Sequence, residues 1–449
     1  MAAGRNEMQP FLESKIDAQT RPPHHRSLFS MWMTALSIFA LFGISVQLMI
    51  SGPPWSQSHH DSHSSPSGND DSNRLVITRD SDSFRIAIFA DLHFGERHRG
   101  EEKDRNTTRL MEYIIRQESP NLAVLNGDLI AGEEVNKETA ASHLYRAVRP
   151  MVNSNLPWAS TYGNHDSQFN MSRDEIYTAE REGYPALSMT RRMGPDGAGV
   201  SNYYVLVEKT GTGPVMILWF FDSRGGAEYQ HRNDKNPEAN IDNWVLAATA
   251  DWFRETSKDL RARFGQLPSL AFVHIPPHVF RSVAEGGLDA ALLPGLNADE
   301  RPLHIQGEGH NDDEFVSALM GEKGLHSVHS SHDHGSSWCA PWPDKERGNL
   351  RRHEGEEDEH DDDGVSREQP ILCFSKRTGY GGYGNWNRGV RILEMRLPQL
   401  ATAGNETQTE LDLGLQVDTW VRMENGNIVT HVSLNETYGK DHYPTANGE

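Results

Sequence analysis

Five polar motifs in the sequence each follow a short apolar run. They occur in the order Asp-x-His, Gly-Asp, Gly-Asn-His-Asp, a single His and His-x-His. Bounded apolar runs of this length are typical of buried strands. Because ligands of open α/β sheets bind at the carboxyl ends of the strands, we expect the polar residues of the motifs to meet at one edge. These residues are Asp91, His93, Asp128, Asn164, His165, Asp166, His274, His332 and His334.

This mixture of carboxylate, imidazole and amide groups suits two divalent or trivalent metal ions such as Mn, Fe or Zn. We expect one ion to be held by Asp91, His93, Asp128 and His334. The other would be held by Asn164, His274, His332 and the shared Asp128. Any one of these histidines could instead be an ordinary hydrogen-bonded residue at a strand end. Their ordered occurrence at strand ends favours the metal site.

His165 is not needed as a ligand in this scheme. We therefore predict that it donates a proton to the leaving-group oxygen of a substrate, and that Asp166 orients it. Two residues outside the motifs, Arg224 and His278, are predicted to contact the substrate. A surface loop position is an equally favoured reading of His278.

Strands and helices alternate between the motifs, which predicts parallel βαβ units. Helices are expected over 107–118, 139–152 and 240–263. Later strands are expected over 201–208, 215–221, 370–374, 390–397, 415–421 and 427–433. The glycine-rich segment 379–384 lacks the lysine and the following helix of a phosphate-binding loop, so we expect it to pack beside the metal edge.

An apolar run over 28–50 has no Asp, Glu, Lys or Arg and is long enough to cross a bilayer. Basic residues precede it, and the first basic residue after it is Arg74. The positive-inside rule then predicts a single-pass anchor with a cytoplasmic tail at 1–27 and a luminal or extracellular remainder, in the secretory pathway, the vacuole or the cell surface. A cleaved signal peptide would leave the same compartment without the tether. Glycosylation sequons agree with this topology, at Asn106, Asn170, Asn405 and Asn435.

The 449-residue chain carries a net charge of -21, which argues against nucleic acid as a partner. We expect a flexible linker at 51–80, one catalytic domain at 81–438 and a tail at 439–449. An acidic run within about 343–369 predicts a disordered insertion, with a calcium loop as the less favoured alternative. The two cysteines, Cys339 and Cys373, flank it and are predicted to form a disulfide; two buried free thiols are the alternative. No obligate protein partner is evident.

From about Phe84 to Arg396 the motifs resemble those of the calcineurin-like metallophosphoesterases, and within them a fungal and plant branch similar to purple acid phosphatases. The resemblance implies a four-layer αββα sandwich of mixed α/β class, with two mixed sheets faced by helices. In this chain, the transmembrane helix expected from the apolar run over 28–50 would precede it. It also implies a dinuclear site at the carboxyl edges of the sheets and in-line attack by a metal-bound hydroxide, without a phosphoenzyme.

Two positions depart from the pattern of that family. Ala131 follows Asp128-Leu-Ile where purple enzymes carry a tyrosine nearby, and His93 stands in the first motif, so no tyrosinate–iron colour is expected. Ser331 stands where the last motif usually has glycine, which fits if the backbone there does not need a positive φ.

The sequence therefore predicts a membrane-tethered phosphatase that acts on phosphomonoesters. A phosphodiesterase that acts on nucleotides or lipid head groups is the alternative with the same site. An inactive metal-binding scaffold on the membrane is the alternative from another functional class.

Overall fold

The computed structural model describes residues 74–444, apart from 79–80, 82, 169–170, 230–239, 301, 308–309, 344–369 and 397–414. Several predicted features lie outside this part of the chain: the cytoplasmic tail at 1–27, the anchor, the acidic insertion, Asn170 and Asn405. Within it, no helix is both long and apolar enough to span a bilayer.

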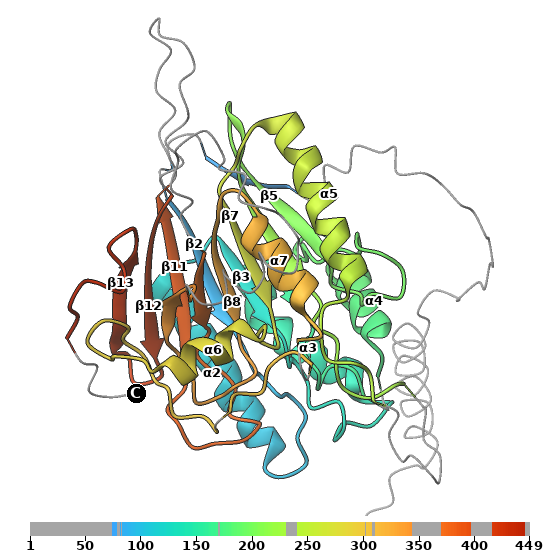
Figure 1. Ribbon diagram of the computed structural model, residues 1–449. Coiled ribbons are helices and arrows are strands. Elements are labelled where there is room, and N and C mark those ends of the chain that lie inside the picture. Colours follow the sequence, from blue (N-terminus) through green and yellow to red (C-terminus); the bar gives the residue numbers. More distant parts are fainter. Residues whose placement is uncertain are drawn as a thin grey trace, which may run out of the picture. The chain divides into compact units, whose positions relative to one another are not determined.

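Two mixed sheets form the centre of the domain (Figure 1). The six-stranded sheet has the order β13-β12-β11-β2-β3-β4, in which β2, β3 and β4 are parallel and β11 is antiparallel to β2. Its strands are β2 (Ser83–Phe89), β3 (Leu122–Asn126), β4 (Trp158–Thr161), β11 (Gly389–Arg396), β12 (Gln416–Met423) and β13 (Ile428–Leu434).

The seven-stranded sheet has the order β1-β5-β6-β7-β8-β10-β9, with a parallel run from β6 to β10. Its strands are β1 (Arg74–Ile77), β5 (Tyr203–Lys209), β6 (Gly213–Phe221), β7 (Ser269–Val273), β8 (Leu325–Ser330), β9 (Cys339–Pro341) and β10 (Ile371–Phe374). The predicted mixed α/β class with two mixed sheets is confirmed.

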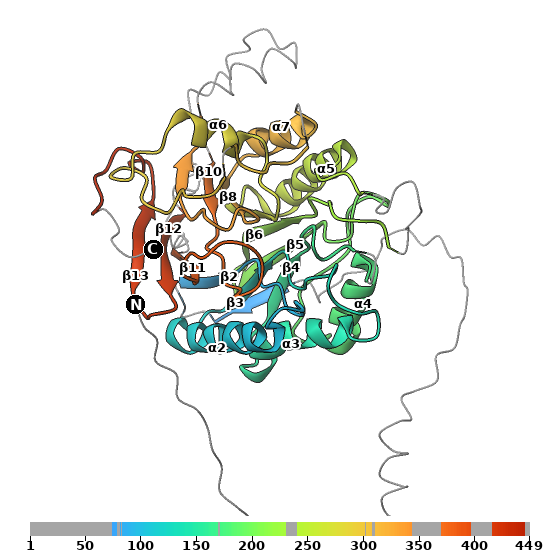
Figure 2. The same cartoon turned by 90° about the horizontal axis from the view of Figure 1, so that it is seen from below.

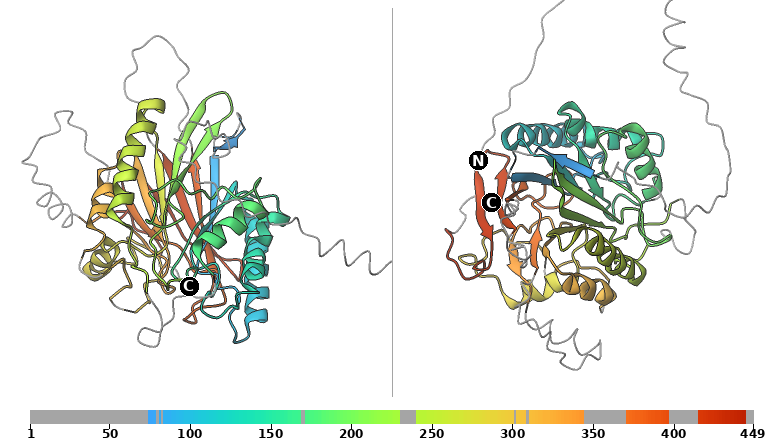
Figure 3. Two further views of the ribbon diagram at one scale, coloured as in Figure 1. Left: turned by 90° about the vertical axis from the view of Figure 1, so that its right-hand side faces the viewer. Right: turned by 90° about the horizontal axis from the view of Figure 1, so that it is seen from above.

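Helices cover the outer faces of both sheets. Figure 2 shows α2 (Gly100–Glu118) and α3 (Ala140–Asn153) along one outer face. The opposite face carries α5 (Ala247–Phe264), α6 (Val279–Gly286) and α7 (Asp313–Gly321). The view from the other end in Figure 3 shows the same layers. The sixth described helix, α4 (Arg173–Gly183), follows β4.

The alternation of side chains along the strands explains the layers. On β2, Ile86 and Ile88 join the cluster between the two sheets, whereas Ala87 and Phe89 pack with α2 and α3. Successive side chains of a strand point to opposite faces, so strands that are apolar at every position must be covered on both sides. The domain accordingly has one apolar cluster between the sheets and one beneath each helical layer.

The prediction of one helix over 240–263 is wrong at its start, because α5 begins only at Ala247. The preceding residues are held in a loop by bonds to other segments. Asn243 Oδ1 accepts a hydrogen bond from the Gly307 amide at 3.2 Å, and the Val245 amide donates to Gln306 Oε1 at 2.9 Å. The sequence prediction also lacked β1, β9, α4, α6 and α7. A capping box from Ser172 to Glu175 marks the start of α4 and could have been recognised.

Cys339 and Cys373 form the predicted disulfide. They lie directly opposite each other on the antiparallel strands β9 and β10. Both are buried, Cys339 at 1% and Cys373 at 0% exposure. The bond therefore joins the two ends of the segment that contains the acidic run.

Candidate metal centre

The strand ends bring the predicted ligands together from both sheets. Asp91 and His93 follow β2, Asp128 follows β3, and Asn164 follows the adjacent β4. His274 follows β7, and His332 and His334 follow the neighbouring β8. Hydrogen bonds join these strand ends directly. The His332 amide donates to Asp91 Oδ1 at 3.1 Å, and the His93 amide donates to the Asp128 carbonyl at 2.9 Å.

The first predicted ligand set is compact. His93 Nε2 lies 3.3 Å from His334 Nε2 and 3.6 Å from Asp128 Oδ2. His334 Nε2 lies 3.8 Å from Asp91 Oδ1. Atoms at these separations can share one cation. In the described part of the chain, the group around His93 whose ligand atoms all lie within 4.8 Å of one another consists of His93, Asp128 and His165.

The second set is arranged around the other side of Asp128. His274 Nε2 lies 3.2 Å from Asp128 Oδ2, and the rings of His274 and His332 are 5.3 Å apart in an edge-on arrangement. Asp128, His274 and His332 each offer a ligand atom within 4.8 Å of the other two. The loop that carries Asn164 also approaches closely, since a Cβ on Gly163 would lie 2.2 Å from Asp128 Oδ1.

Two histidines have their ring orientation fixed by backbone carbonyls. The Nδ1 of His274 lies 2.9 Å from the carbonyl oxygen of Asn126, and the Nδ1 of His334 lies 3.0 Å from that of Tyr383. A carbonyl only accepts, so Nδ1 carries a proton in both rings, and Nε2 is the atom that would bind a metal ion once the ring is neutral. A hydrogen bond from the ring nitrogen that does not bind the metal is typical of metal-ligating histidines.

Three buried ligand atoms have no hydrogen-bond partner within the described part of the chain: Asp91 Oδ2, Asn164 Oδ1 and His274 Nε2. Buried polar atoms are normally satisfied, and leaving one unpaired costs about 1–3 kcal/mol. All three belong to predicted ligands. The donor set therefore fits bound cations, which would satisfy these atoms.

The pKa values of the buried ligands also fit bound cations. Burial lowers the pKa values of His93 and His332 to about 3, so both rings are neutral and can coordinate. Burial raises the pKa of Asp91 to about 7. Burial also opposes ionisation of Asp128, but positive charge on His274 and His165 holds its pKa well below the usual range. Buried carboxylates require such compensating charge, which metal ions can supply.

Four of the predicted ligands adopt the left-handed backbone region that non-glycine residues rarely enter. Their φ angles are 52° for Asp91, 48° for His93, 52° for Asp128 and 75° for His332. Such conformations cost about 1–3 kcal/mol each and gather at functional sites. Ser331 has no positive φ, so serine is accommodated there as expected, and its Oγ accepts a hydrogen bond from Asn126 Nδ2 at 2.7 Å.

His165 lies beside the centre, and its ring is 4.9 Å from that of His93. The carboxylate that contacts it is Glu133, whose Oε1 is 2.8 Å from His165 Nδ1. Burial lowers the pKa of His165, but the negative charges of Asp128 and Glu133 outweigh this and raise it to about 10. A ring with this pKa carries a proton at neutral pH, which is compatible with the predicted role of His165.

The hydrogen bonds of Asp166 within the described residues go to backbone amides, and its predicted role in orienting His165 stays a prediction. Its Oδ1 accepts from the amides of Leu129 and Ile130 at 2.8 and 3.1 Å, and its Oδ2 accepts from Gly163 at 2.8 Å. The carboxylate therefore joins the loop after β3 to the loop after β4. Glu133 was not predicted, although it follows Asp128 closely in the same strand-end loop.

The comparisons with known proteins agree with this geometry. The sequence model of the calcineurin-like phosphoesterases matches residues 84–336. The chain belongs to the calcineurin-like phosphoesterase family. The chain is also 25% identical over 345 residues to a protein of Arabidopsis thaliana named probable inactive purple acid phosphatase 29, which covers 70% of this chain and 77% of the relative.

A second relative of this phosphoesterase is the phosphatase DCR2 of Saccharomyces cerevisiae, which is 25% identical over 279 residues. That match covers 58% of this chain and 45% of DCR2. Among solved structures, a dimetal phosphatase from Danio rerio is similar at 10% identity with a TM-score of 0.43, over 78% of this chain and 98% of the other. The family implies divalent metal ions, and the His and Asp groups described above could bind them.

The glycine-rich segment of the phosphoesterase packs against the ligands as predicted. A Cβ on Gly382 would lie 2.4 Å from His334 Cε1 and 2.9 Å from His93 Nε2. Buried Arg377 donates to the carbonyls of Gly379 and Gly384 at 3.0 and 3.1 Å, and also to those of Gly381 and Tyr383. The segment therefore forms a fixed support for the two imidazoles.

Arg224 lies beside the Asn164 loop. The segment 224–225 is joined to that loop by Arg173, which donates to the carbonyls of Gly163, Arg224 and Gly225 at 2.8, 2.7 and 3.1 Å. The Nη1 of Arg224 is buried and has no hydrogen-bond partner among the described residues, and the residue has a φ of 60°. This guanidinium interacts electrostatically with Asp242 and Asp222.

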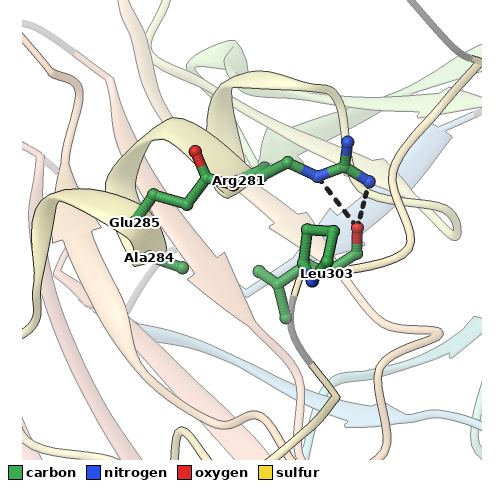
Figure 4. Close-up of a pocket in the computed structure, with 5 residues that line it drawn as sticks. Arg281, Ala284, Glu285 and Leu303 are labelled. Atoms are coloured by element: carbon green, nitrogen blue, oxygen red, sulfur yellow. Dashed lines mark hydrogen bonds between the residues drawn. The ribbon is translucent and has the colours of Figure 1, made fainter.

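His278 forms a separate cluster at the start of α6. Its Nδ1 lies 2.7 Å from Asp312 Oδ1, and its ring is 4.6 Å from that of His310. A nearby pocket of about 300 Å³ lies between α6 and the loop at Leu303, where Arg281 donates to the Leu303 carbonyl (Figure 4). No predicted metal ligand lines this pocket.

Proposed function

We propose that this phosphoesterase is a dinuclear-metal phosphatase that hydrolyses phosphomonoesters. The observation that carries the proposal is that histidines from both sheets converge on Asp128, beside buried side-chain oxygens of Asp91 and Asn164 that have no hydrogen-bond partner among the described residues. When bound, two metal ions would supply Lewis-acid polarisation of the phosphoryl group and activation of the attacking water.

The residues of the chain would then handle the leaving group and the phosphoryl oxygens. His165 would donate its Nε2 proton to the ester oxygen as the P–O bond breaks, while Glu133 holds its Nδ1. Arg224 would pair with a phosphoryl oxygen, because Arg173 joins its backbone to the loop after β4 and its Nη1 has no hydrogen-bond partner among the described residues. Donation and charge pairing of this kind need no covalent intermediate on the protein.

The word inactive in the name of the Arabidopsis relative does not extend to this chain by itself. All seven predicted ligands and His165 are present in the sequence. The yeast relative bears the name of a phosphatase. We therefore favour an active enzyme over a metal-binding scaffold.

The same proposal includes a membrane anchor at 28–50 and a luminal or extracellular domain. Of the described sequons, Asn435 is exposed and its Oδ1 accepts hydrogen bonds from the Thr437 amide and hydroxyl at 3.0 and 2.9 Å. Asn106 is half-buried on α2. A mass loss on treatment of the native protein with an N-glycosidase supports this topology, and unmodified Asn435 and Asn106 contradict it.

Hydrolysis of p-nitrophenyl phosphate tests the activity. The full chain, stripped of metal and reloaded with Mn, Zn or Fe, should turn over, and Asp128→Asn and His165→Ala should each reduce the rate at least about a hundredfold. Asp251→Asn, an exposed aspartate on α5, is the matched control and should match the wild type. Turnover of only bis(p-nitrophenyl) phosphate would replace the proposal with a diesterase, and metal binding without turnover of either compound would favour the scaffold.

A further inference from the structure

We propose that a pocket next to Asn164 receives the leaving group of the substrate and selects uncharged, hydroxyl-rich leaving groups such as sugars and polyols. This inference rests on the proposed phosphatase function. The pocket measures about 400 Å³, which is within the range of small-molecule sites. Its lining includes Gln168, Gly226, Asn240, Asp242, Asn243 and Trp244.

The pocket borders the metal centre at Asn164. A Cβ on Gly226 would lie 2.2 Å from the carbonyl oxygen of Asn164, and one on Gly225 would lie 3.0 Å from Asn164 Cβ and 3.2 Å from Asn243 Cβ. Gln168 Nε2 donates to the same Asn164 carbonyl at 3.4 Å. Gly226 and Gln168, which line the pocket, therefore pack directly on the backbone of the predicted ligand Asn164.

The proton donor lies on the same loop as the pocket wall. His165 and Gln168 are three residues apart, and both pack on Gly132: a Cβ there would lie 2.4 Å from the His165 carbonyl oxygen and 3.1 Å from Gln168 Cβ. The oxygen that His165 would protonate stays with the leaving group when the P–O bond breaks. This oxygen therefore connects the reacting centre to the part of the substrate that the pocket would hold.

Hydrogen bonds within the protein hold the pocket wall in place without a substrate. The Gly225 amide donates to the Asp242 carbonyl at 3.0 Å, and the Ile241 amide donates to the Gly226 carbonyl at 2.9 Å. Asn243 is fixed by the Gly307 amide. A preformed wall lowers the entropy cost of binding.

The chemistry of the lining determines which leaving group fits. Amide side chains offer both donors and acceptors, which match hydroxyl groups, and the Trp244 indole can pack against the C–H face of a ring. None of the described lining residues is Lys, Arg or His, and the exposed Asp242 adds a negative charge. Arg224, which interacts electrostatically with Asp242, is not among the lining residues and would be paired with the phosphoryl group. A leaving group with a carboxylate or a further phosphate would be repelled there.

The test compares two phosphomonoesters, neutral glucose 6-phosphate and acidic 3-phosphoglycerate, with the full metal-loaded chain. Wild type should have the higher kcat/KM for glucose 6-phosphate. Asp242→Asn should raise kcat/KM for 3-phosphoglycerate about fivefold and leave glucose 6-phosphate unchanged. Trp244→Leu should lower kcat/KM for glucose 6-phosphate about fivefold, and Asn240→Ala, at an exposed position, should lower it as well.

Asp259→Asn, an exposed aspartate on α5, is the matched control and should change neither value. A higher kcat/KM of the wild type for 3-phosphoglycerate overturns the inference. So does the combination of an unchanged ratio of the two kcat/KM values in Asp242→Asn and unchanged kcat/KM in the other two variants. If p-nitrophenyl phosphate is not hydrolysed either, the proposed function fails. In that case, calorimetry of glucose 6-phosphate binding to the wild type and the three variants still tests whether the pocket binds the leaving group. Equal affinities of all four proteins would refute it.

Discussion

Replacement of Glu133 by Gln tests the orientation of the proton donor. The change keeps the shape of the side chain and removes the charge that faces His165 Nδ1 at 2.8 Å. A hydrogen bond between charged groups contributes about 1.5–3 kcal/mol when shielded. The side chains of His165 and Glu133 are 33% and 37% exposed, so solvent reduces this to about 1 kcal/mol. We therefore expect kcat to fall roughly fivefold.

The assay compares p-nitrophenyl phosphate with phenyl phosphate. Phenolate is the poorer leaving group and needs the proton more, so Glu133→Gln should reduce kcat more for phenyl phosphate than for p-nitrophenyl phosphate. Glu134→Gln is the matched control, because Glu134 is the adjacent residue and its Oε2 accepts from the Arg97 amide at 2.6 Å.

A double-mutant cycle separates an effect through His165 from a general structural effect. In the His165→Ala background, Glu133→Gln should cause no further loss. Equal losses for the two substrates, or the same loss with and without His165, would refute the assigned role of Glu133.

Three further predictions concern the support of the site and the stability of the fold. Gly382→Ala places a Cβ 2.4 Å from His334 Cε1 at a φ of +67° and should weaken metal affinity about tenfold or more, as measured by competition with a chelator. Burial lowers the pKa of His326 from 6.5 to about 4, so as the pH falls the unfolded chain takes up this proton before the folded protein does. The free energy of unfolding should therefore be highest above about pH 6.5 and fall by roughly 2 kcal/mol between about pH 7 and pH 5 in urea titrations. The fall should be smaller in His326→Gln. Removing the disulfide with Cys339→Ala and Cys373→Ala, 34 residues apart, should cost about 3–4 kcal/mol in the same titrations, and an unchanged midpoint would contradict this.

The convergence of the candidate metal ligands could be predicted from sequence because each follows an apolar run closely. Strand ends in a parallel sheet share an edge, so a local pattern determined a long-range arrangement. Asp128 and His274 illustrate this, since they are far apart in the chain yet their side chains lie 3.2 Å apart. The order of strands within each sheet was not predicted, because apolar runs do not specify their neighbours.

The contacts around the ligands could not be read from the sequence. Glu133 lies 32 positions from His165, and only the packing of two loops brings their side chains together. Likewise, Asn240 to Leu246 has helical spacing of apolar residues, but the hydrogen bonds of Asn243 and Val245 to the 306–307 segment hold it in a loop. Tertiary hydrogen bonds override local preference at both places.

Metal quantification by mass spectrometry tests the central claim most directly. The full chain, reloaded with Mn, Zn or Fe and freed of excess ion, should hold two ions per molecule. Asp128→Asn removes the ligand shared by both sets and should hold at most one, whereas Asp251→Asn should hold two. One ion or none in the wild type, or two tightly held ions in Asp128→Asn, would contradict a dinuclear centre built on Asp128.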